Sequence, residues 1–194
     1  MAFSQVGLLL ILGLLWSVES PCEVPVCATC HPKETGRFLE SSMGHSLESP
    51  KPRPNGSAIH GRSRSIIQVM DRGGNMFHRI SERGPTAEYQ VKYQLGSGKA
   101  GHAYLVPVDD YLIQSPVGYS QQGWDVAPSF ANKPLLDFDS PVDARCLFCH
   151  ADNAKFADID GRRLSGVPIT AVSCDRCHGP TSNHVRHPSA KNIV

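Results

Sequence analysis

The chain has 194 residues, of which 40% are apolar and 19% are charged, and its formal net charge is +1. This balance gives no reason to expect nucleic acid as a partner, and it argues against a disordered chain or a membrane bundle. Aromatic residues make up only 7%, whereas 17 Gly and 15 Pro residues indicate many turns and a small side-chain core.

The first twenty residues are typical of an export signal. Residues 6–16 form an uninterrupted apolar run, and Val18 and Ser20 offer positions for signal cleavage. A buried core helix is the alternative, but the N-terminal position favours export. The run is shorter than the ~20 apolar residues that a bilayer requires. We therefore expect residues 1–20 to be a signal peptide or an N-terminal anchor, followed by one domain at residues 22–194.

Six of the seven cysteines form three pairs of identical spacing, and a histidine follows each pair directly. The motifs are CATCH at 27–31, CLFCH at 146–150 and CDRCH at 174–178. C-x-x-C-H is the attachment signature of c-type haem, in which two thiols bind the porphyrin and the imidazole reaches the iron. We therefore predict three haem c groups. Their thioethers are expected at Cys27, Cys30, Cys146, Cys149, Cys174 and Cys177, and their proximal iron ligands at His31, His150 and His178.

A zinc site and disulfide bonds are the alternatives to haem. The four cysteines of the second and third motifs fit a zinc-binding structural module, and disulfides form outside the cytoplasm. The zinc interpretation leaves Cys27 and Cys30 unexplained and treats three adjacent histidines as accidents. Tight CxxC pairs also indicate redox or metal chemistry more often than structural bridges. Haem is the better interpretation, and the seventh cysteine, Cys22, is given no role.

A short helix is predicted over residues 32–47, directly after the first motif. Phe38, Leu39 and Met43 form its apolar stripe. Met43 and His45 lie at opposite margins of that stripe, so helical periodicity does not choose between them as iron ligands. Core filling by Met43 and surface exposure of His45 are the alternatives.

A central antiparallel β segment is predicted at about 63–115. Its strands are expected at residues 65–70, 76–81, 88–95, 102–108 and 111–115, and the first two, which flank the glycine-containing segment 71–75, are expected to form a hairpin. The glycine-rich stretch 96–101 lacks the strand-to-helix context of a nucleotide-binding loop. We expect instead a flexible backbone that lets His102 approach a flat macrocycle.

A low-spin haem needs a second axial ligand, His or Met, whereas an empty position opens the iron to small molecules. The remaining candidates are His45, His60, His78, His102, His184 and His187, together with Met43, Met70 and Met76. Gly179 and Pro180 turn the chain directly after the third motif, so that His184 or His187 can fold back over a neighbouring haem.

The chain resembles bacterial multihaem c-type cytochromes with doubled CxxCH motifs, which are related to haem modules fused to tetratricopeptide repeats. The resemblance covers roughly residues 22–194. Besides the three motifs it rests on SSMGHSL at 41–47, IHGRS at 59–63, LGSGKAGHAYL at 95–105, GWDVAPSF at 123–130, and His184. It implies distal ligands at His60, His102 and His184, with Met43 as a further recurrent position.

The resemblance also implies a task and a compartment. Such proteins are electron carriers or haem modules of larger redox systems, and some related ones are reductases. Relatives usually continue past the segment at 187–189 into a further CxxCH, so we expect a C-terminally truncated member. We expect a bacterial protein in the periplasm or at the outer face of the inner membrane, touching the membrane only through an uncleaved anchor. Its partners would be other redox proteins and not nucleic acid.

The expected fold is irregular α+β, with short helices around three covalent haems and a central antiparallel β segment. Haem edges would supply much of the interior. The expected function is one-electron transfer, which makes the chain a carrier more than a catalyst. The alternatives are a haem module of a reductase with one open iron site and the zinc-binding module.

Overall fold

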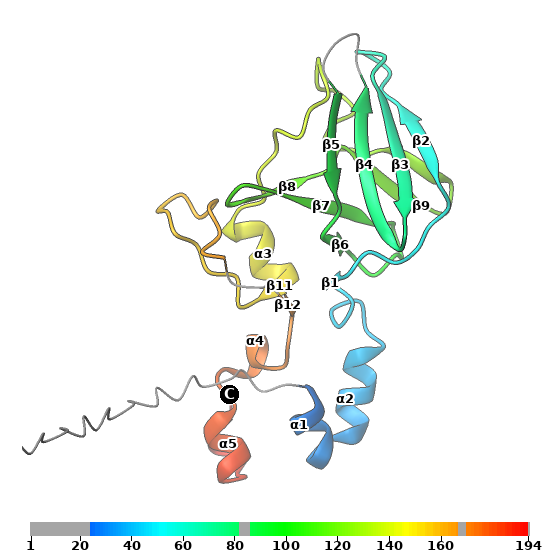
Figure 1. Ribbon diagram of the computed structural model, residues 1–194. Coiled ribbons are helices and arrows are strands. Elements are labelled where there is room, and N and C mark those ends of the chain that lie inside the picture. Colours follow the sequence, from blue (N-terminus) through cyan, green and yellow to red (C-terminus); the bar gives the residue numbers. More distant parts are fainter. Residues whose placement is uncertain (1–23, 82–85, 167–169, 194) are drawn as a thin grey trace, which may run out of the picture.

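The computed structural model describes residues 24–81, 86–166 and 170–193 (Figure 1). The expected signal segment at 1–20 and Cys22 lie outside these residues. Among the described helices, none has both the length and the apolar composition that a membrane crossing requires.

One antiparallel sheet has the strand order β2-β3-β4-β5. Its strands are β2 (Gly56–Ile59), β3 (Ile66–Arg72), β4 (Asn75–Ser81) and β5 (Thr86–Gln90). Ile67 of β3 is opposite Ile80 of β4 in the register, and both are buried. Gly73 and Gly74 adopt φ angles of 64° and 83° at the two central positions of the β3–β4 turn. Positive φ at both positions suits a tight hairpin, which confirms the hairpin expected here.

A second antiparallel sheet has the order β1-β6-β7-β8. Its strands are β1 (Leu47–Glu48), β6 (Tyr93–Leu95), β7 (Ala103–Val108) and β8 (Tyr111–Gln114). The alternation along β7 sends Tyr104 and Val106 into a core shared with the first sheet, whereas Leu105 enters a second core. That second core also contains Leu147 of helix α3 (Ala144–His150). Strand β7 therefore connects the interior of the β region to the helix of the second motif.

Two small sheets and four more helices complete the described fold. Strands β9 (Val117–Ser120) and β10 (Gly123–Val126) form one antiparallel pair, and β11 (Ala151–Asp152) and β12 (Thr170–Ala171) form the other. The remaining described helices are α1 (Val24–Cys30), α2 (Pro32–Leu39), α4 (Asp175–His178) and α5 (Ser182–Arg186).

The expected fold class is wrong, because the described chain is mostly β-strand in four antiparallel sheets and not a set of helices around haems. Strands occur outside the expected segment 63–115, at β1, β2, β9, β10, β11 and β12. The low aromatic content predicted a small side-chain core. The core is larger than expected, because the few aromatic residues are concentrated in one place. Tyr104 and Phe130 are fully buried between the sheets, and Trp124 packs against them. The two sheets thus cover each other's apolar faces.

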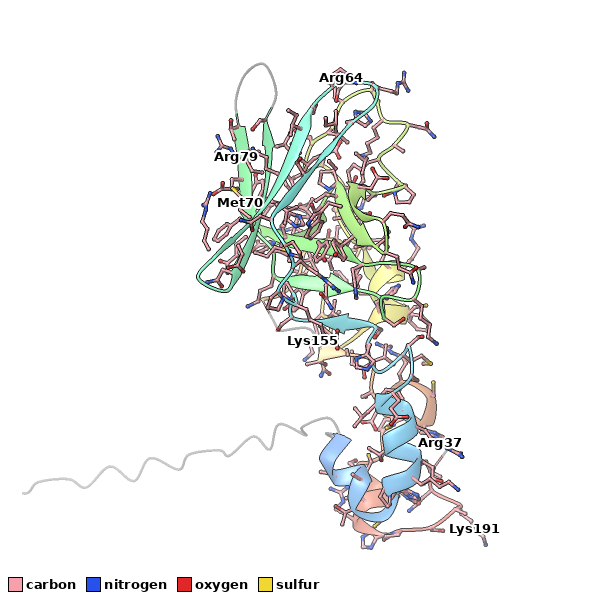
Figure 2. All side chains as sticks on the ribbon, turned by 90° about the vertical axis from the view of Figure 1, so that its right-hand side faces the viewer. Arg37, Arg64, Met70, Arg79, Lys155 and Lys191 are labelled. Atoms are coloured by element: carbon pink, nitrogen blue, oxygen red, sulfur yellow. The ribbon has the colours of Figure 1, made fainter. Side chains whose placement is uncertain are left out.

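The described helices, except α3, gather at one end of the molecule, away from β2–β5 (Figure 1). Figure 2 places Arg64 and Arg79 at the sheet end and Arg37 and Lys191 at the helical end. Helix α3 lies between these two parts, beneath β7 and β8.

Candidate haem-binding sites

Each CxxCH motif lies on or beside a short helix. Helix α1 carries the cysteines of the first motif, α3 carries the second motif, and α4 carries most of the third, with Cys174 at its N-cap. A spacing of three residues puts both cysteines of a motif on one side of a helix. Four of the six motif cysteines are exposed and the other two are partly exposed. The thiols are therefore accessible to a porphyrin.

The helix of the second motif begins at an N-cap that fixes its cysteines. The Asp143 carboxylate accepts hydrogen bonds from the backbone N–H groups of Arg145 at 3.0 Å and Cys146 at 3.2 Å. It also pairs with the Arg145 guanidinium at 2.6 Å. The Arg145 side chain, followed by the Cys146 N–H group, lowers the pKa of Asp143 to about 2. The cap is consequently charged at neutral pH.

A cavity of about 300 Å³ adjoins the second motif. Cys146, Cys149 and His150 line one side of it. The other walls come from β6, β8 and the segment around α3, through Leu95, Gln114, Val142 and Arg145. Thiols, imidazole and apolar walls meet here, which is the set of groups that an attached porphyrin requires.

The ring of His150 is oriented by a segment that follows the first motif. Its Nδ1 lies 3.4 Å from the backbone oxygen of Ser46, and the Ser46 hydroxyl donates to the His150 carbonyl at 2.9 Å. Because a carbonyl oxygen can only accept, Nδ1 carries the proton and Nε2 keeps its lone pair. This is the tautomer that a proximal ligand needs, and the backbone carbonyl is a common outer partner of such histidines.

The first motif faces helix α5, which follows the third motif in the chain. The rings of His31 and His184 have centroids 6.2 Å apart and planes inclined by 24°. His184 Nδ1 lies 3.1 Å from the Ser189 carbonyl oxygen and 3.0 Å from Asn192 Oδ1. The carbonyl oxygen requires a protonated Nδ1, so Nε2 of His184 also keeps its lone pair. The structure therefore brings a predicted proximal ligand and a predicted distal ligand together.

The third motif ends in the expected turn. Gly179 adopts a φ of 66°, a left-handed conformation that glycine tolerates, directly after the exposed His178. The Thr181 hydroxyl then donates to Asp175 Oδ1 at 2.6 Å, which ties the turn to the start of α4. This turn leads the chain into α5 and places His184 against the first motif.

His60 lies in the β region and not beside a CxxCH motif. It is almost fully buried after β2, and its neighbour Arg64 is at the sheet end of the molecule (Figure 2). Its Nδ1 accepts from the Ser63 backbone N–H at 3.2 Å, and its Nε2 donates to the Ala131 carbonyl at 3.3 Å. Both ring nitrogens are used in this arrangement.

His102 lies just before β7, beside the glycine-rich loop. A side chain at Gly98 would approach His102 Nε2 to 2.8 Å, so the glycine lets the loop close over the ring. Burial, followed by the charge of Arg53, lowers the pKa of His102. The ring is therefore neutral at pH 7, which is the form that binds a metal. Its buried Nδ1 has no hydrogen-bond partner among the residues described.

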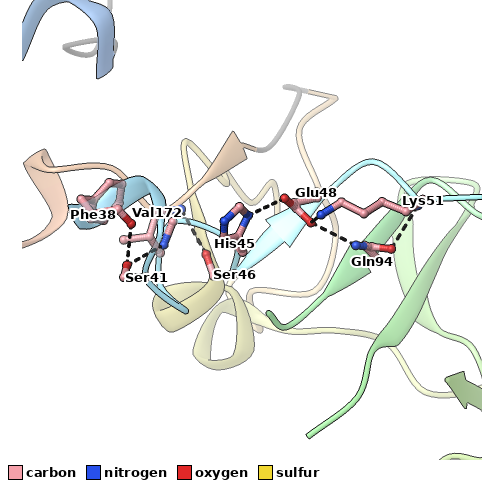
Figure 3. A network of polar contacts seen from close by, with 9 residues as sticks. Phe38, Ser41, His45, Ser46, Glu48, Lys51, Gln94 and Val172 are labelled. Atoms are coloured by element: carbon pink, nitrogen blue, oxygen red, sulfur yellow. Dashed lines mark hydrogen bonds and ion pairs between the residues drawn. The ribbon is translucent and has the colours of Figure 1, made fainter. Parts of the chain in front are cut away.

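His45 belongs to a polar network between α2 and the second sheet (Figure 3). Its Nδ1 lies 2.7 Å from Glu48 Oε1, and Lys51 and Gln94 bind the second carboxylate oxygen. Partial burial opposes the effect, but hydrogen bonds from Lys51, His45 and Gln94 lower the pKa of Glu48 to about 2. Met43 is about half exposed in the preceding loop. Neither Met43 nor His45 is among the residues that line the cavity at the second motif.

Three further residues take part in the sites, although sequence reasoning missed them. Ser46 contacts His150 and accepts from the Val172 N–H at 3.4 Å, so it links the segments of all three motifs. Asp152 and Arg176 form an ion pair at 3.0 Å between the second and third motifs. Of these three residues, only Arg176 could have been identified from the sequence, because it occupies a variable position inside a CxxCH motif.

Among the described residues, no three or more His, Cys, Asp or Glu side chains gather to hold a bare metal ion. The cysteines of the second and third motifs, in particular, do not form a four-cysteine group. One imidazole on either side of a haem iron needs no such cluster.

Residues 128–179 match the family model of cytochrome c554 and c-prime. The match supports a c-type cytochrome. It spans α3, β11, β12 and α4, and so includes the second and third CxxCH motifs. No curated protein and no solved structure matches the chain. The family match supports haem c as the cofactor and electron transfer as the activity.

Proposed function

We propose that this c-type cytochrome is an exported multihaem protein that carries single electrons through three covalently bound haems. The six motif cysteines would form the thioethers, with His31, His150 and His178 as proximal ligands. When bound, each haem supplies a one-electron iron couple. The chain's own residues orient the ligands, keep the attachment sites close together and set the local charge.

The placement of His31 opposite His184 carries this proposal. Two imidazoles on opposite sides of one iron have ring centroids about 6 Å apart, because each metal–nitrogen bond is about 2 Å long and each ring adds about 1.1 Å. The observed separation is 6.2 Å, and the planes are inclined by only 24°. The separation is close to the distance that an iron held by both rings would require, and the angle between the planes does not decide the question. The Nδ1 contacts of His184 leave its Nε2 available for that role.

His184 is therefore our distal ligand for the first haem. The geometry supports no such pairing for the other two haems. His60 and His102 stay predictions from the resemblance, and Met43 and His45 stay further candidates. Of the predicted ligands His60 and His102, only His102 has a ring nitrogen, its buried Nδ1, without a hydrogen-bond partner among the described residues, since both nitrogens of His60 are hydrogen-bonded.

The test compares His184→Ala with His187→Ala, an exposed histidine three residues further along. In a host that attaches haem, the wild type should give three haems per chain by pyridine haemochrome assay. His184→Ala should convert one of them from low-spin to high-spin in its electron paramagnetic resonance (EPR) and absorption spectra. His187→Ala should leave all spectra unchanged. Identical spectra for both variants would exclude the pairing, and a chain without haem stain would exclude the function.

A second candidate function is a haem module of a reductase with one open iron site. It is favoured by the cavity at the second motif, whose lining includes no His or Met other than His150. An iron there without a second ligand would bind small molecules. Carbon monoxide separates the two functions, because it should leave the reduced spectrum of a carrier unchanged and shift that of an open haem.

The compartment and the partners belong to the same proposal. Haem c attachment and the N-terminal apolar run support a location in the periplasm or at the outer face of the inner membrane. The partners would be other redox proteins. Membrane contact would be limited to an uncleaved N-terminal anchor, and cell fractionation with haem staining tests this location.

A further inference from the structure

The second and third CxxCH motifs are held together by one side chain. Arg176 occupies a variable position of the third motif and reaches three groups of the second motif's segment. Its guanidinium carbon lies 5.2 Å from the centre of the Phe148 ring. One terminal nitrogen donates to the Ala151 carbonyl at 2.7 Å, and Nε lies 3.0 Å from Asp152 Oδ1. Phe148 itself lies between the two cysteines of the second motif.

The partner carboxylate is buried and has a second contact to the third motif. Asp152 is 8% exposed, and its Oδ2 accepts from the Ser173 backbone N–H at 2.6 Å. Strands β11 and β12 add a short antiparallel ladder between the same segments, with Ala151 opposite Ala171. An ion pair with a buried carboxylate and additional hydrogen bonds holds a fixed geometry, although the Arg176 side chain is partly exposed.

We infer that Arg176 is a positioning residue that fixes the second haem against the third, so that the two form one directly coupled redox pair. The inference rests on the proposed function, because it requires haems at both motifs. The planar guanidinium is suited to this role, since it can stack on an aromatic ring and bond two oxygen atoms at once. A lysine keeps the charge but lacks this fork. The cation also favours the reduced, less positive state of nearby haems.

The test uses Arg176→Gln and Arg176→Lys, with Arg162→Gln as the matched control. Arg162 is exposed and lies between the same two motifs, and its backbone N–H donates to Asp158. All proteins are first assayed for three haems per chain. The readouts are the spin–spin interaction between ferric haems in EPR spectra and a potentiometric titration followed by absorption.

We expect the wild type and Arg162→Gln to show the same magnetic interaction. Arg176→Gln and Arg176→Lys should both lose it, because the fork is missing in both. Arg176→Gln should also lower the ratio of reduced to oxidised haem in the pair about tenfold at a fixed potential, which is 59 mV for one electron. Arg176→Lys should shift it less, because it keeps the charge.

Three results separate a failure of the proposed function from a failure of the positioning role of Arg176. A wild type without haem at the second or third motif overturns the proposed function. Three haems in every protein, with the same magnetic interaction in Arg176→Gln as in Arg162→Gln, overturn only the positioning role. If Arg176→Gln fails to attach haem, Arg176→Lys still decides, because an unchanged interaction in that variant refutes the need for the fork.

Discussion

His78 makes the stability of the β region depend on pH in a way that a single substitution can test. Its side chain is fully buried on β4, with Nδ1 2.8 Å from the Ser115 hydroxyl. Burial lowers the pKa of His78 from 6.5 to about 3. The imidazole is therefore neutral in the folded protein at pH 5, whereas it is protonated in the unfolded chain.

The sign and size of the effect follow from proton linkage. Between pH 6.5 and pH 3 the unfolded chain binds the extra proton, so the free energy of unfolding falls as the pH falls. With pKa values of about 3 folded and 6.5 unfolded, lowering the pH from 7 to 5 removes about 2 kcal/mol. Carboxylates with lowered pKa values, such as Glu48 and Asp143, act mainly below this range.

The assay is guanidinium unfolding followed by far-ultraviolet circular dichroism at several pH values between 5 and 7. His78→Asn keeps a polar group near Ser115 but does not titrate, and exposed His187→Asn serves as the control. Over this range the wild type and His187→Asn should lose about 2 kcal/mol more than His78→Asn. Comparison of slopes removes any constant loss of stability in the variant. Equal slopes for His78→Asn and the wild type would refute the neutral, buried imidazole.

Two substitutions test the packing around the sites. Asp152→Ala should lower the free energy of unfolding by about 2–4 kcal/mol, because it leaves the Ser173 N–H and the Arg176 guanidinium without their buried partner. Denaturant unfolding should show this loss, with little change for exposed Asp160→Ala. Gly56→Ala would place Cβ 2.3 Å from Trp124 Cδ1 and should cost about 1–3 kcal/mol, whereas Gly61→Ala meets nothing within 4 Å. Equal melting temperatures for the two alanine variants would contradict this close approach.

Sequence reasoning performed best where the interactions are local. The β3–β4 hairpin was predicted because its alternating pattern and its Gly73-Gly74 turn lie within a few residues of each other. Sequence reasoning failed for the fold class, because the β region is held together by the packing of one sheet against the other. No local pattern marks Gly56, for example, whereas in the structure it lets Trp124 close against β2.

The predicted distal ligands also differ in ways that sequence reasoning did not distinguish. The sequence offered His60, His102 and His184 as equals, and the structure gives them different surroundings. His184 faces His31, His102 keeps an unpartnered nitrogen, and His60 is hydrogen-bonded at both nitrogens in the β region. These differences come from contacts between segments far apart in the chain, which no local pattern records.

The sequence by itself predicted the attachment chemistry, because two cysteines and a histidine within five residues are brought together by one turn of helix. Only the tertiary structure decided how the three motifs relate to one another. The packing of α5 on the first motif pairs His31 with His184, and the β11–β12 ladder brings Arg176 to Asp152. Local geometry fixes which atoms would bind a haem, whereas the placement of the three motifs relative to one another depends on long-range packing.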